Sequence, residues 1–309
     1  MAENIVVVGS CMIDFTCYSP RLPKPGETVI GSKFEQNYGG KGANQCVMAA
    51  RLGASTTLVA SLGADSFGFE YLKILKEEKI NVSYIQLQNN KHSGVAHITV
   101  AENGENSICI VLGANELLSP KVVDSSIDVI KNASILLLQF EIPLETTLHA
   151  LRVHKGHGIS IVNGAPSIKN VNTEILSLCD IFCVNETEAE IMTDIESLSS
   201  ENIQEAINKL LLLGCNTVII TLGALGAVYA SQSQKTITRI TTSSVEPVDT
   251  TGAGDAFLGA FAYFKASHPM LSMDECIRRA CYVATESVLK YGTHGSYPKK
   301  SLLPVELFQ

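Results

Sequence analysis

The 309-residue chain has few basic side chains, no long apolar run and no basic segment at its start. Lys and Arg number 23 against 31 Asp and Glu, and the net charge of −8 argues against nucleic acid or an acidic membrane as a partner. No stretch approaches the roughly 18 apolar residues of a membrane-spanning helix. Because Glu3 stands where a signal peptide would carry Lys or Arg, we expect a cytoplasmic protein, with a nuclear pool also allowed.

Zinc-binding and disulfide patterns are also missing. Cys179 and Cys183 stand four residues apart, but neither a second pair nor a nearby His completes a zinc-binding set. The cysteine count of nine is odd, the chain is long, and Cys46, Cys183 and Cys281 lie in apolar surroundings. We therefore expect reduced thiols packed in the core.

Two common nucleotide-binding motifs are absent as well. The stretch Gly39-Gly40-Lys41-Gly42 has no Ser or Thr after its lysine and no Gly five residues before it, so it is not a P-loop. No Gly-x-Gly-x-x-Gly follows a strand candidate either. The stretch instead predicts a turn that opens a helix and presents Lys41 and Asn44 as hydrogen-bond donors.

What the sequence does contain is a regular alternation of short apolar runs with helical periodicity. Strands buried on both faces are predicted at Ile5–Gly9, Thr56–Leu62, Ile135–Gln139, Ile159–Asn163, Ile181–Val184 and Thr217–Leu222. Helices are predicted at 42–52, 66–79, 120–131, 143–155, 201–213, 253–266 and 272–290. This rhythm predicts an α/β fold in one domain over residues 1–309, with a mainly parallel central sheet sandwiched by helices.

Two segments, 27–38 and 94–112, alternate apolar with polar residues instead. The second contains Asn103-Gly104, a hairpin turn signal. We expect a small antiparallel sheet from about 15–40 and 94–112 that forms a lid over the carboxyl ends of the parallel strands, where ligands bind in such folds. A hairpin that merely decorates one edge of the sheet is the alternative.

The segment from Asp249 to Asp255 (DTTGAGD) is the strongest candidate for chemistry. Gly252 and Gly254 allow backbone amides to gather at a helix start, where unpaired N–H groups and the helix dipole attract anions. Asp255 falls in the first turn, beside any phosphate held there; its alternative role is only to stabilise the helix terminus. Asp249 and the two threonines form an oxygen-rich loop that also suits a hard cation.

Polar side chains follow several of the predicted strands. Asp14, Glu141 and Asn163 stand at or just beyond strand ends, and Asn185 and Glu188 do the same after Ile181–Val184. Each has a structural alternative as a helix cap, and Asn185 with Glu188 fits an N-terminal capping pattern. Together they predict a polar rim along one edge of the sheet, and hence a binding site.

The motifs 249–255 and 39–45 (GGKGANQ) together resemble the paired signatures of the phosphofructokinase-B-type sugar kinases. The resemblance runs from Ile5 to about Phe308. The segments 9–12, 218–223, 292–293 and 296–298 are most similar to animal members that act on D-ribose. The resemblance implies ATP-dependent phosphorylation of the D-ribose 5-hydroxyl to D-ribose 5-phosphate, with Mg²⁺ and an activating K⁺, by a homodimer joined through the lid.

The resemblance also implies roles for individual residues. Asp255 would be the catalytic base, with Gly252, Ala253 and Gly254 forming the anion hole. The sugar would contact Met12, Ile13, Asp14, Gly40, Lys41, Gly42, Ala43, Asn44, Glu141 and Asp255. ATP would contact Asn185, Thr221, Leu222, Gly223, Ala224, Leu225, Gly226, Gly254, Asp255 and Cys281. Potassium would take oxygens of Asp249, Thr251, Ser287, Lys290, Gly292 and Ser296, and Glu188 would organise magnesium through water.

Two positions depart from the family pattern. Cys281 stands where bacterial members have a histidine near the adenine, and Gly164 stands in a loop where Asn-Pro-Ala-Pro is usual. The alternatives that remain are a kinase of the same family for fructose, 2-keto-3-deoxygluconate or adenosine, and a catalytically idle nucleotide-binding regulator. The intact Asp255 and glycines argue against the idle protein.

Overall fold

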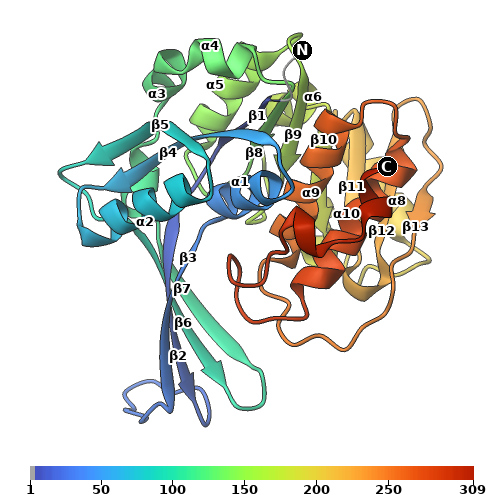
Figure 1. Ribbon diagram of the computed structural model, residues 1–309. Helices are drawn as coiled ribbons and strands as arrows, with labels where there is room; N and C mark the ends of the chain where they lie inside the picture. The colour runs from blue at the N-terminus through green and yellow to red at the C-terminus, as the bar shows by residue number, and fades with distance from the viewer. Residues whose placement is uncertain (1–3) are drawn as a thin grey trace.

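The computed structural model describes residues 4–309, and its centre is a nine-stranded sheet in the order β13-β12-β11-β10-β9-β8-β1-β4-β5 (Figure 1). Neighbouring strands are parallel except around β12, which pairs antiparallel with β11 and β13. The strands are β1 Asn4–Val8, β4 Ser55–Gly63, β5 Asn81–Gln88, β8 Ile135–Leu138, β9 Ile159–Asn163, β10 Ile181–Asn185, β11 Thr217–Thr221, β12 Ala227–Ser231 and β13 Thr238–Ile240. The mainly parallel sheet and all six predicted strands are confirmed.

Helices cover both faces of this sheet (Figure 1). They are α1 Lys41–Arg51, α2 Ser66–Glu77, α3 Pro120–Ser125, α4 Ile127–Lys131, α5 Leu144–His154, α6 Thr173–Leu178, α7 Glu186–Thr193, α8 Ile203–Leu212, α9 Ala253–Ser267 and α10 Met273–Ser287. The prediction of one helix over 120–131 is wrong, because the chain bends at Ser126. There the hydroxyls of Ser125 and Ser126 both donate to the Val122 carbonyl, at 2.8 and 2.9 Å, and compete with the helical pattern.

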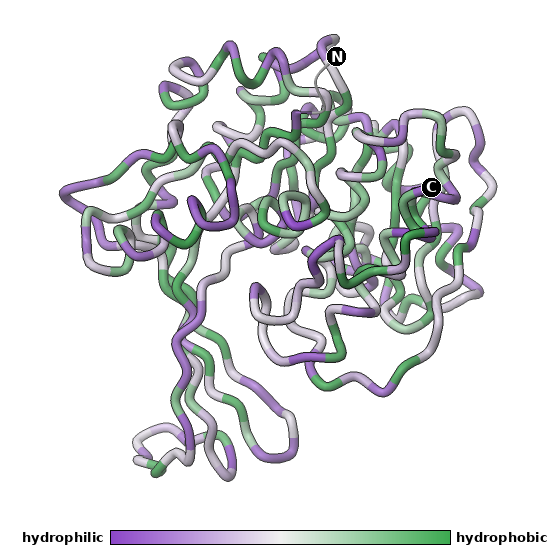
Figure 2. The backbone as a smooth tube through the Cα atoms, viewed as in Figure 1, coloured by the Kyte–Doolittle hydropathy of each residue, from purple (hydrophilic) through white to green (hydrophobic). Residues whose placement is uncertain are grey.

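Two apolar layers fill the space between sheet and helices. In β1, Ile5 and Val7 belong to the layer under α1, α9 and α10, whereas Val6 and Val8 face the opposite layer. This period of two explains why each central strand is a continuous apolar run in the sequence. The tube in Figure 2 is accordingly apolar along these strands.

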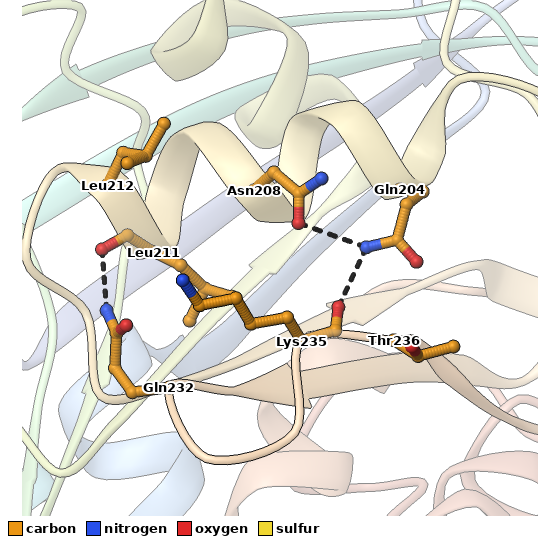
Figure 3. A pocket seen from close by; sticks show the side chains of 7 residues that line it. All are labelled: Gln204, Asn208, Leu211, Leu212, Gln232, Lys235 and Thr236. Carbon is orange, nitrogen blue, oxygen red and sulfur yellow. Dashed lines mark hydrogen bonds between the residues drawn. The ribbon is translucent and has the colours of Figure 1, made fainter.

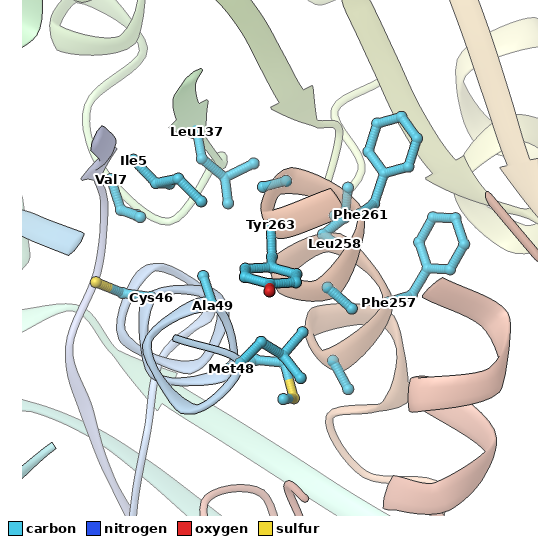
Figure 4. Close-up of a cluster of buried hydrophobic side chains, with 14 of the residues drawn as sticks. Ile5, Val7, Cys46, Met48, Ala49, Leu137, Phe257, Leu258, Phe261 and Tyr263 are labelled. Atoms are coloured by element: carbon cyan, nitrogen blue, oxygen red, sulfur yellow. The ribbon is translucent and has the colours of Figure 1, made fainter. Parts of the chain in front are cut away.

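Helices α1 and α9 approach each other closely at Gly259. A Cβ atom at this position would lie 2.5 Å from the Gln45 carbonyl oxygen and 2.7 Å from Met48 Cβ, so only glycine fits without moving a helix. Figure 4 shows Met48, Leu258 and Tyr263 meeting in the apolar cluster between the two helices. Because Asp255 lies one turn before Gly259, the same contact brings Asp255 toward α1.

A second sheet of four strands projects from the main body (Figure 1). We call it the lid. Its order is β3-β2-β6-β7, with β2 Met12–Ser19, β3 Lys33–Gly39, β6 Gly94–Ala101 and β7 Asn106–Val111. The pairs β2–β3 and β6–β7 are antiparallel, as predicted, while the middle pair β2–β6 is parallel. The turn at Asn103-Gly104 joins β6 to β7, with Gly104 at φ 86°.

Among residues 4–309, no helix has the length and apolar character to span a membrane.

Candidate active site

The start of α9 forms the floor of the site. Gly252 precedes the helix at φ 75°, and a Cβ there would lie 2.6 Å from the Tyr297 hydroxyl, so both backbone and space require glycine. The Tyr297 hydroxyl donates to the Gly252 carbonyl at 3.0 Å and fixes the turn. The Ala253 N–H donates to the Thr250 carbonyl at 3.2 Å, which leaves the N–H groups of Gly254 and Asp255 as the better anion donors of this first turn.

The Asp255 carboxylate lies beside α1 and is only 7% exposed. Its Oδ2 accepts a hydrogen bond from Asn44 Nδ2 at 2.9 Å, and its Oδ1 accepts one from Gln45 Nε2 at 2.9 Å. The two sequence motifs, more than 200 residues apart, therefore meet at one carboxylate. Sequence analysis proposed Asn44 as a site residue but passed over Gln45, which stands next to it in the same motif.

The polar rim is also assembled as predicted. Glu141 Oε2 accepts hydrogen bonds from the Ser10 hydroxyl at 2.6 Å and from the Lys41 backbone N–H at 2.9 Å. Asn44 Oδ1 is buried without a hydrogen-bond partner, which leaves an acceptor for a ligand hydroxyl. Of the other predicted sugar-binding residues, Met12, Ile13, Gly40, Gly42 and Ala43 lie in the same region, at the starts of β2 and α1.

Carboxylates dominate the electrostatics of the rim. Burial, together with the negative charges of Glu141 and Asp255, raises the pKa of Asp14 from 3.8 to about 7. Lys41 faces Asp255, Glu141 and Glu188; burial alone would lower its pKa, but these carboxylates raise it on balance. An ammonium group among several acids is suited to hold a ligand that carries both hydroxyls and phosphates.

Three cavities meet around Thr250–Asp255. The first, about 200 Å³, is mostly apolar, and Phe257, Cys281, Ala284 and Val288 line it together with Thr221, Gly223, Ala224 and Gly226. Burial raises the pKa of Cys281 to about 12, so this wall is a neutral thiol. Of the residues predicted to contact ATP, Leu222 is buried in the core and Leu225 is 64% exposed, and neither side chain lines this cavity.

The second cavity, about 170 Å³, is polar and lies between the first turn of α9 and the end of β10. Lys41, Asn185 and Glu188 line it opposite Gly252–Asp255. Asn185 and Glu188 form the expected capping box, with Glu188 Oε2 accepting from the Asn185 N–H and the Glu188 N–H donating to Asn185 Oδ1, both at 2.8 Å. The same two residues therefore cap α7 and line the cavity. Burial is the main cause that raises the pKa of Glu188.

The third cavity, about 380 Å³, is a cleft between lid and body. Asp14, Thr16, Tyr18, Glu35 and Asn37 project into it from β2 and β3, and the segments 247–251 and 291–293 face them. The edge-decoration alternative for this sheet is wrong, because its inner face forms one wall of the site. Sequence analysis missed Tyr18, Glu35 and Asn37; their period of two along the lid strands was the available signal.

The two segments proposed for potassium lie side by side. Asp249 Oδ1 accepts from the Thr251 N–H at 2.9 Å and Oδ2 from the Gly292 N–H at 2.8 Å, while the Val288 carbonyl accepts from two N–H groups of the first segment. The hydroxyls of Ser287 and Ser296 donate to carbonyls of their own segments. Residues 4–309 contain no cluster of three or more His, Cys, Asp or Glu suited to a metal. This arrangement offers mainly backbone oxygens and one carboxylate, which fits a weakly charged cation better than zinc.

A further cavity of about 440 Å³ lies between α8 and the β12–β13 connection, away from the site (Figure 3). Its polar side chains bond to one another and to backbone: Gln204 Nε2 donates to Asn208 Oδ1 at 3.1 Å and to the Lys235 carbonyl at 2.9 Å, and Gln232 Nε2 donates to the Leu211 carbonyl at 2.7 Å. No carboxylate or histidine lines it. It lacks the groups that chemistry at a phosphate would need.

The raised pKa of Asp14 predicts a cost in stability. Because the folded protein binds this proton up to about pH 7 and the unfolded chain releases it near pH 4, the free energy of unfolding falls as pH rises through this window. Asp14→Asn should therefore raise Tm at pH 8 by the equivalent of about 1 kcal/mol or more, and much less at pH 5. Calorimetry at both pH values measures this. The exposed Asp128→Asn serves as the control; an Asp14→Asn Tm at pH 8 equal to or below that of the parent would contradict the prediction.

Comparisons with known proteins agree with this geometry. The family model for the pfkB family of carbohydrate kinases matches residues 2–300. Ribokinase from Mus musculus is 42% identical over 308 residues, covering 99% of this chain and 95% of that protein. Deoxyribokinase from Salmonella typhi is 36% identical over 296 residues, covering 96% and 95%. The solved structure of Arabidopsis thaliana ribokinase complexed with ribose and ATP superposes with a TM-score of 0.91 at 32% identity, covering 100% and 99%. The chain therefore belongs to the pfkB family of carbohydrate kinases.

Proposed function

We propose that this protein transfers the γ-phosphoryl group of ATP to the 5-hydroxyl of D-ribose, giving ADP and D-ribose 5-phosphate. The observation that carries the proposal is the position of Asp255, which lines the polar cavity close to Thr250, the residue that the apolar cavity, the polar cavity and the lid cleft have in common. Two relatives support the choice of substrate: mouse ribokinase by its identity over nearly the whole chain, and the plant ribokinase whose structure contains ribose and ATP.

Asp255 is the base in the proposed reaction. Its carboxylate accepts the hydroxyl proton as the sugar oxygen forms a bond to the γ-phosphorus and the bond to the β-phosphate oxygen breaks, so the proton ends on Asp255 and the charge on ADP. The N–H groups of Gly254 and Asp255, together with Gly252 and Ala253 of the same turn, stabilise the charge on the transferred group. Lys41 adds a positive charge across the cavity.

The rim holds the sugar. Asp14 and Glu141 accept hydrogen bonds from sugar hydroxyls, and the unpartnered Asn44 Oδ1 accepts another. The Gly40–Asn44 turn supplies backbone contacts, and Met12 and Ile13 lie beside it at the start of β2. Because carboxylates and an amide oxygen provide the acceptors of this rim, a small polyhydroxy sugar suits it.

The apolar cavity holds the adenine, and the residues of the Thr221–Gly226 turn with Asn185 follow the ribose and phosphates of ATP. Magnesium, bound with ATP, would neutralise phosphate charge, and Glu188, which lines the polar cavity, would hold it through water. Potassium would lie at the joined segments of Asp249, Thr251, Ser287, Lys290, Gly292 and Ser296, next to the start of α9. We further propose that the protein works in the cytoplasm, with a nuclear pool also allowed.

A second candidate substrate is 2-deoxy-D-ribose, favoured by the deoxyribokinase relative at 36% identity. The two sugars differ by one hydroxyl. A site that hydrogen-bonds this hydroxyl with buried groups leaves those groups unpaired when the hydroxyl is missing, so it discriminates strongly.

A sugar panel in a coupled ADP-release assay tests the proposal. D-ribose should give the highest kcat/KM, with 2-deoxy-D-ribose, D-fructose, 2-keto-3-deoxygluconate and adenosine each lower by about tenfold or more.

Asp255→Asn, which keeps the shape but loses the base, should lower kcat by about 10³-fold or more with little change in ATP binding. A preference for another compound would replace the substrate, and no turnover of any compound would favour the idle regulator.

The potassium site predicts a dependence on the monovalent cation. Replacing KCl by tetramethylammonium chloride at constant ionic strength should depress kcat by about tenfold or more, since the bulky ion cannot take the place of K⁺ among the oxygens of these two segments. Asp249→Asn should weaken the response to K⁺, because it removes the one carboxylate of the site. Equal activity in both salts would remove the potassium proposal and leave the kinase assignment in place.

The lid predicts self-association. Phe34, Ile108, Ile110 and Val111 on its strands are 46–59% exposed, an unusual amount of apolar surface for a monomer. We propose that two copies pair through their lids. Sedimentation at micromolar concentration should give a dimer, and Ile110→Lys should shift it toward monomer, while the equally apolar but distant Val305→Lys should not. A monomeric parent protein would contradict this.

A further inference from the structure

Two buried glutamines behind the catalytic base have no role in the function proposed above. Gln45 on α1 and Gln139, directly after β8, are both 0% exposed. Gln139 Nε2 donates to Gln45 Oε1 at 2.6 Å, and Gln45 Nε2 donates to Asp255 Oδ1 at 2.9 Å. They form a short chain that ends on the carboxylate.

Only one arrangement of the two amides satisfies this chain. An ionised carboxylate can only accept, so Gln45 must present its NH₂ group to Asp255, and its carbonyl oxygen must then face Gln139. Gln139 must in turn present its own NH₂ group. The donor direction along the whole chain therefore follows from the charge of Asp255.

The strand ends hold this chain in place from the other side. Gln45 Nε2 also donates to Asn163 Oδ1 at 3.2 Å, and Asn163 Nδ2 donates to the Cys183 carbonyl at 3.2 Å. Asn163 ends β9 and Cys183 lies in β10, so three neighbouring strands contribute to the orientation of a single amide. With Asn44 bonded to Oδ2 at 2.9 Å, both oxygens of Asp255 are fixed and its plane cannot rotate.

At the Gln139 end of this hydrogen-bonded chain, the environment favours a functional role over a contribution to stability. Gln139 Oε1 is buried without a hydrogen-bond partner, and a Cβ on Gly9 would lie 2.1 Å from it. A buried oxygen without a partner is destabilising, so an apolar side chain at 139 would serve packing better. The amide is explained by what its other end does, which is to orient Gln45.

We propose that Gln45 and Gln139 are positioning residues that hold the Asp255 carboxylate in the plane and the charge state that accept the sugar proton. The inference deepens the proposed function and depends on Asp255 as the base. Neither glutamine touches substrate; each acts through the carboxylate.

Other charged groups face Asp255 and must be kept apart from this effect. Asp14, Lys41, Glu188 and the Tyr297 hydroxyl all interact with it electrostatically. We therefore choose kcat at saturating sugar and ATP, which reports on the ternary complex, in which the ligands cover Asp14, Lys41 and Glu188. Repeating the profile in the Asp14→Asn background separates the titration of that group.

The test measures kcat against pH for the parent, Gln45→Met, Gln45→Glu and Gln139→Met. Gln45→Met keeps the volume but removes the donor, so kcat should fall about tenfold or more, with KM for the sugar changed less than threefold, and the acid limb should move up by about one pH unit. Gln45→Glu should move it further, because a second carboxylate opposes ionisation. Gln139→Met should give a smaller shift in the same direction, and the double variant Gln45→Met/Gln139→Met should match Gln45→Met alone.

A matched control separates positioning from packing. Thr146 is also 0% exposed, and its hydroxyl donates to the Leu118 carbonyl at 2.6 Å, away from the site. Thr146→Val should lower Tm and leave the acid limb unchanged. If Gln45→Met does not fold, the near-isosteric Gln45→Glu and the more distant Gln139→Met carry the test.

An acid limb that stays in place in folded Gln45→Glu and Gln139→Met would overturn the inference. A fall in kcat accompanied by an equal fall in Thr146→Val would overturn it as well. These outcomes differ from failure of the proposed function, in which the parent protein itself does not phosphorylate D-ribose. If the panel identifies another sugar, the same profiles are measured with that sugar.

Discussion

The close contact of α1 with α9 is the constraint on which the site depends. Gly259 lets the two helix backbones approach to a distance that any side chain would prevent, and Asp255 lies one turn before it on the same face. The carboxylate can therefore reach Asn44 and Gln45 from a helix whose start also supplies the anion-binding amides. One packing contact thus brings together the proposed base, its hydrogen-bond donors and the proposed phosphate site, which three separate loops would hold less rigidly.

The site concentrates negative charge in a protein that is already acidic. Among residues 4–309, Asp14, Glu141, Glu188 and Asp255 surround one nearby ammonium, that of Lys41, although the ligand proposed for the site includes a polyphosphate. The negative charges of the site and of the ligand can coexist if they lie in different parts of it. In the proposed complex, Asp14, Glu141 and Asp255 would face the sugar, helix-terminal amides and Lys41 would face the phosphates, and bound cations would add the remaining positive charge. The arrangement lowers the stability of the folded protein through Asp14, as expected where a binding site is built from buried acids.

Sequence patterns predicted the parts of the fold that depend on period and composition. The central strands are buried on both faces, so they are continuous apolar runs, and they were found close to their true bounds. The edge strands β5 and β13 were missed, because they mix polar with apolar residues and resemble loops, and the short strand β12 beside β13 was missed with them. The helix over 120–131 was wrong at Ser126, where two hydroxyls compete for one carbonyl. This local competition does not change the spacing of the apolar residues, so that spacing could not predict the bend.

For the site, the sequence by itself determined which residues can do chemistry: the glycine turn with Asp255, the Lys41–Asn44 turn, and the polar residues at strand ends. These follow from local rules, since helix starts, turns and strand ends are set by neighbouring residues. Only the tertiary structure decided that Gln45 and Gln139 stand behind the base, that Leu225 points to solvent, and that Tyr18, Glu35 and Asn37 line the cleft. Those facts depend on contacts between segments 90 to more than 200 residues apart, and the packing of helices and sheets sets such contacts, which no local pattern records.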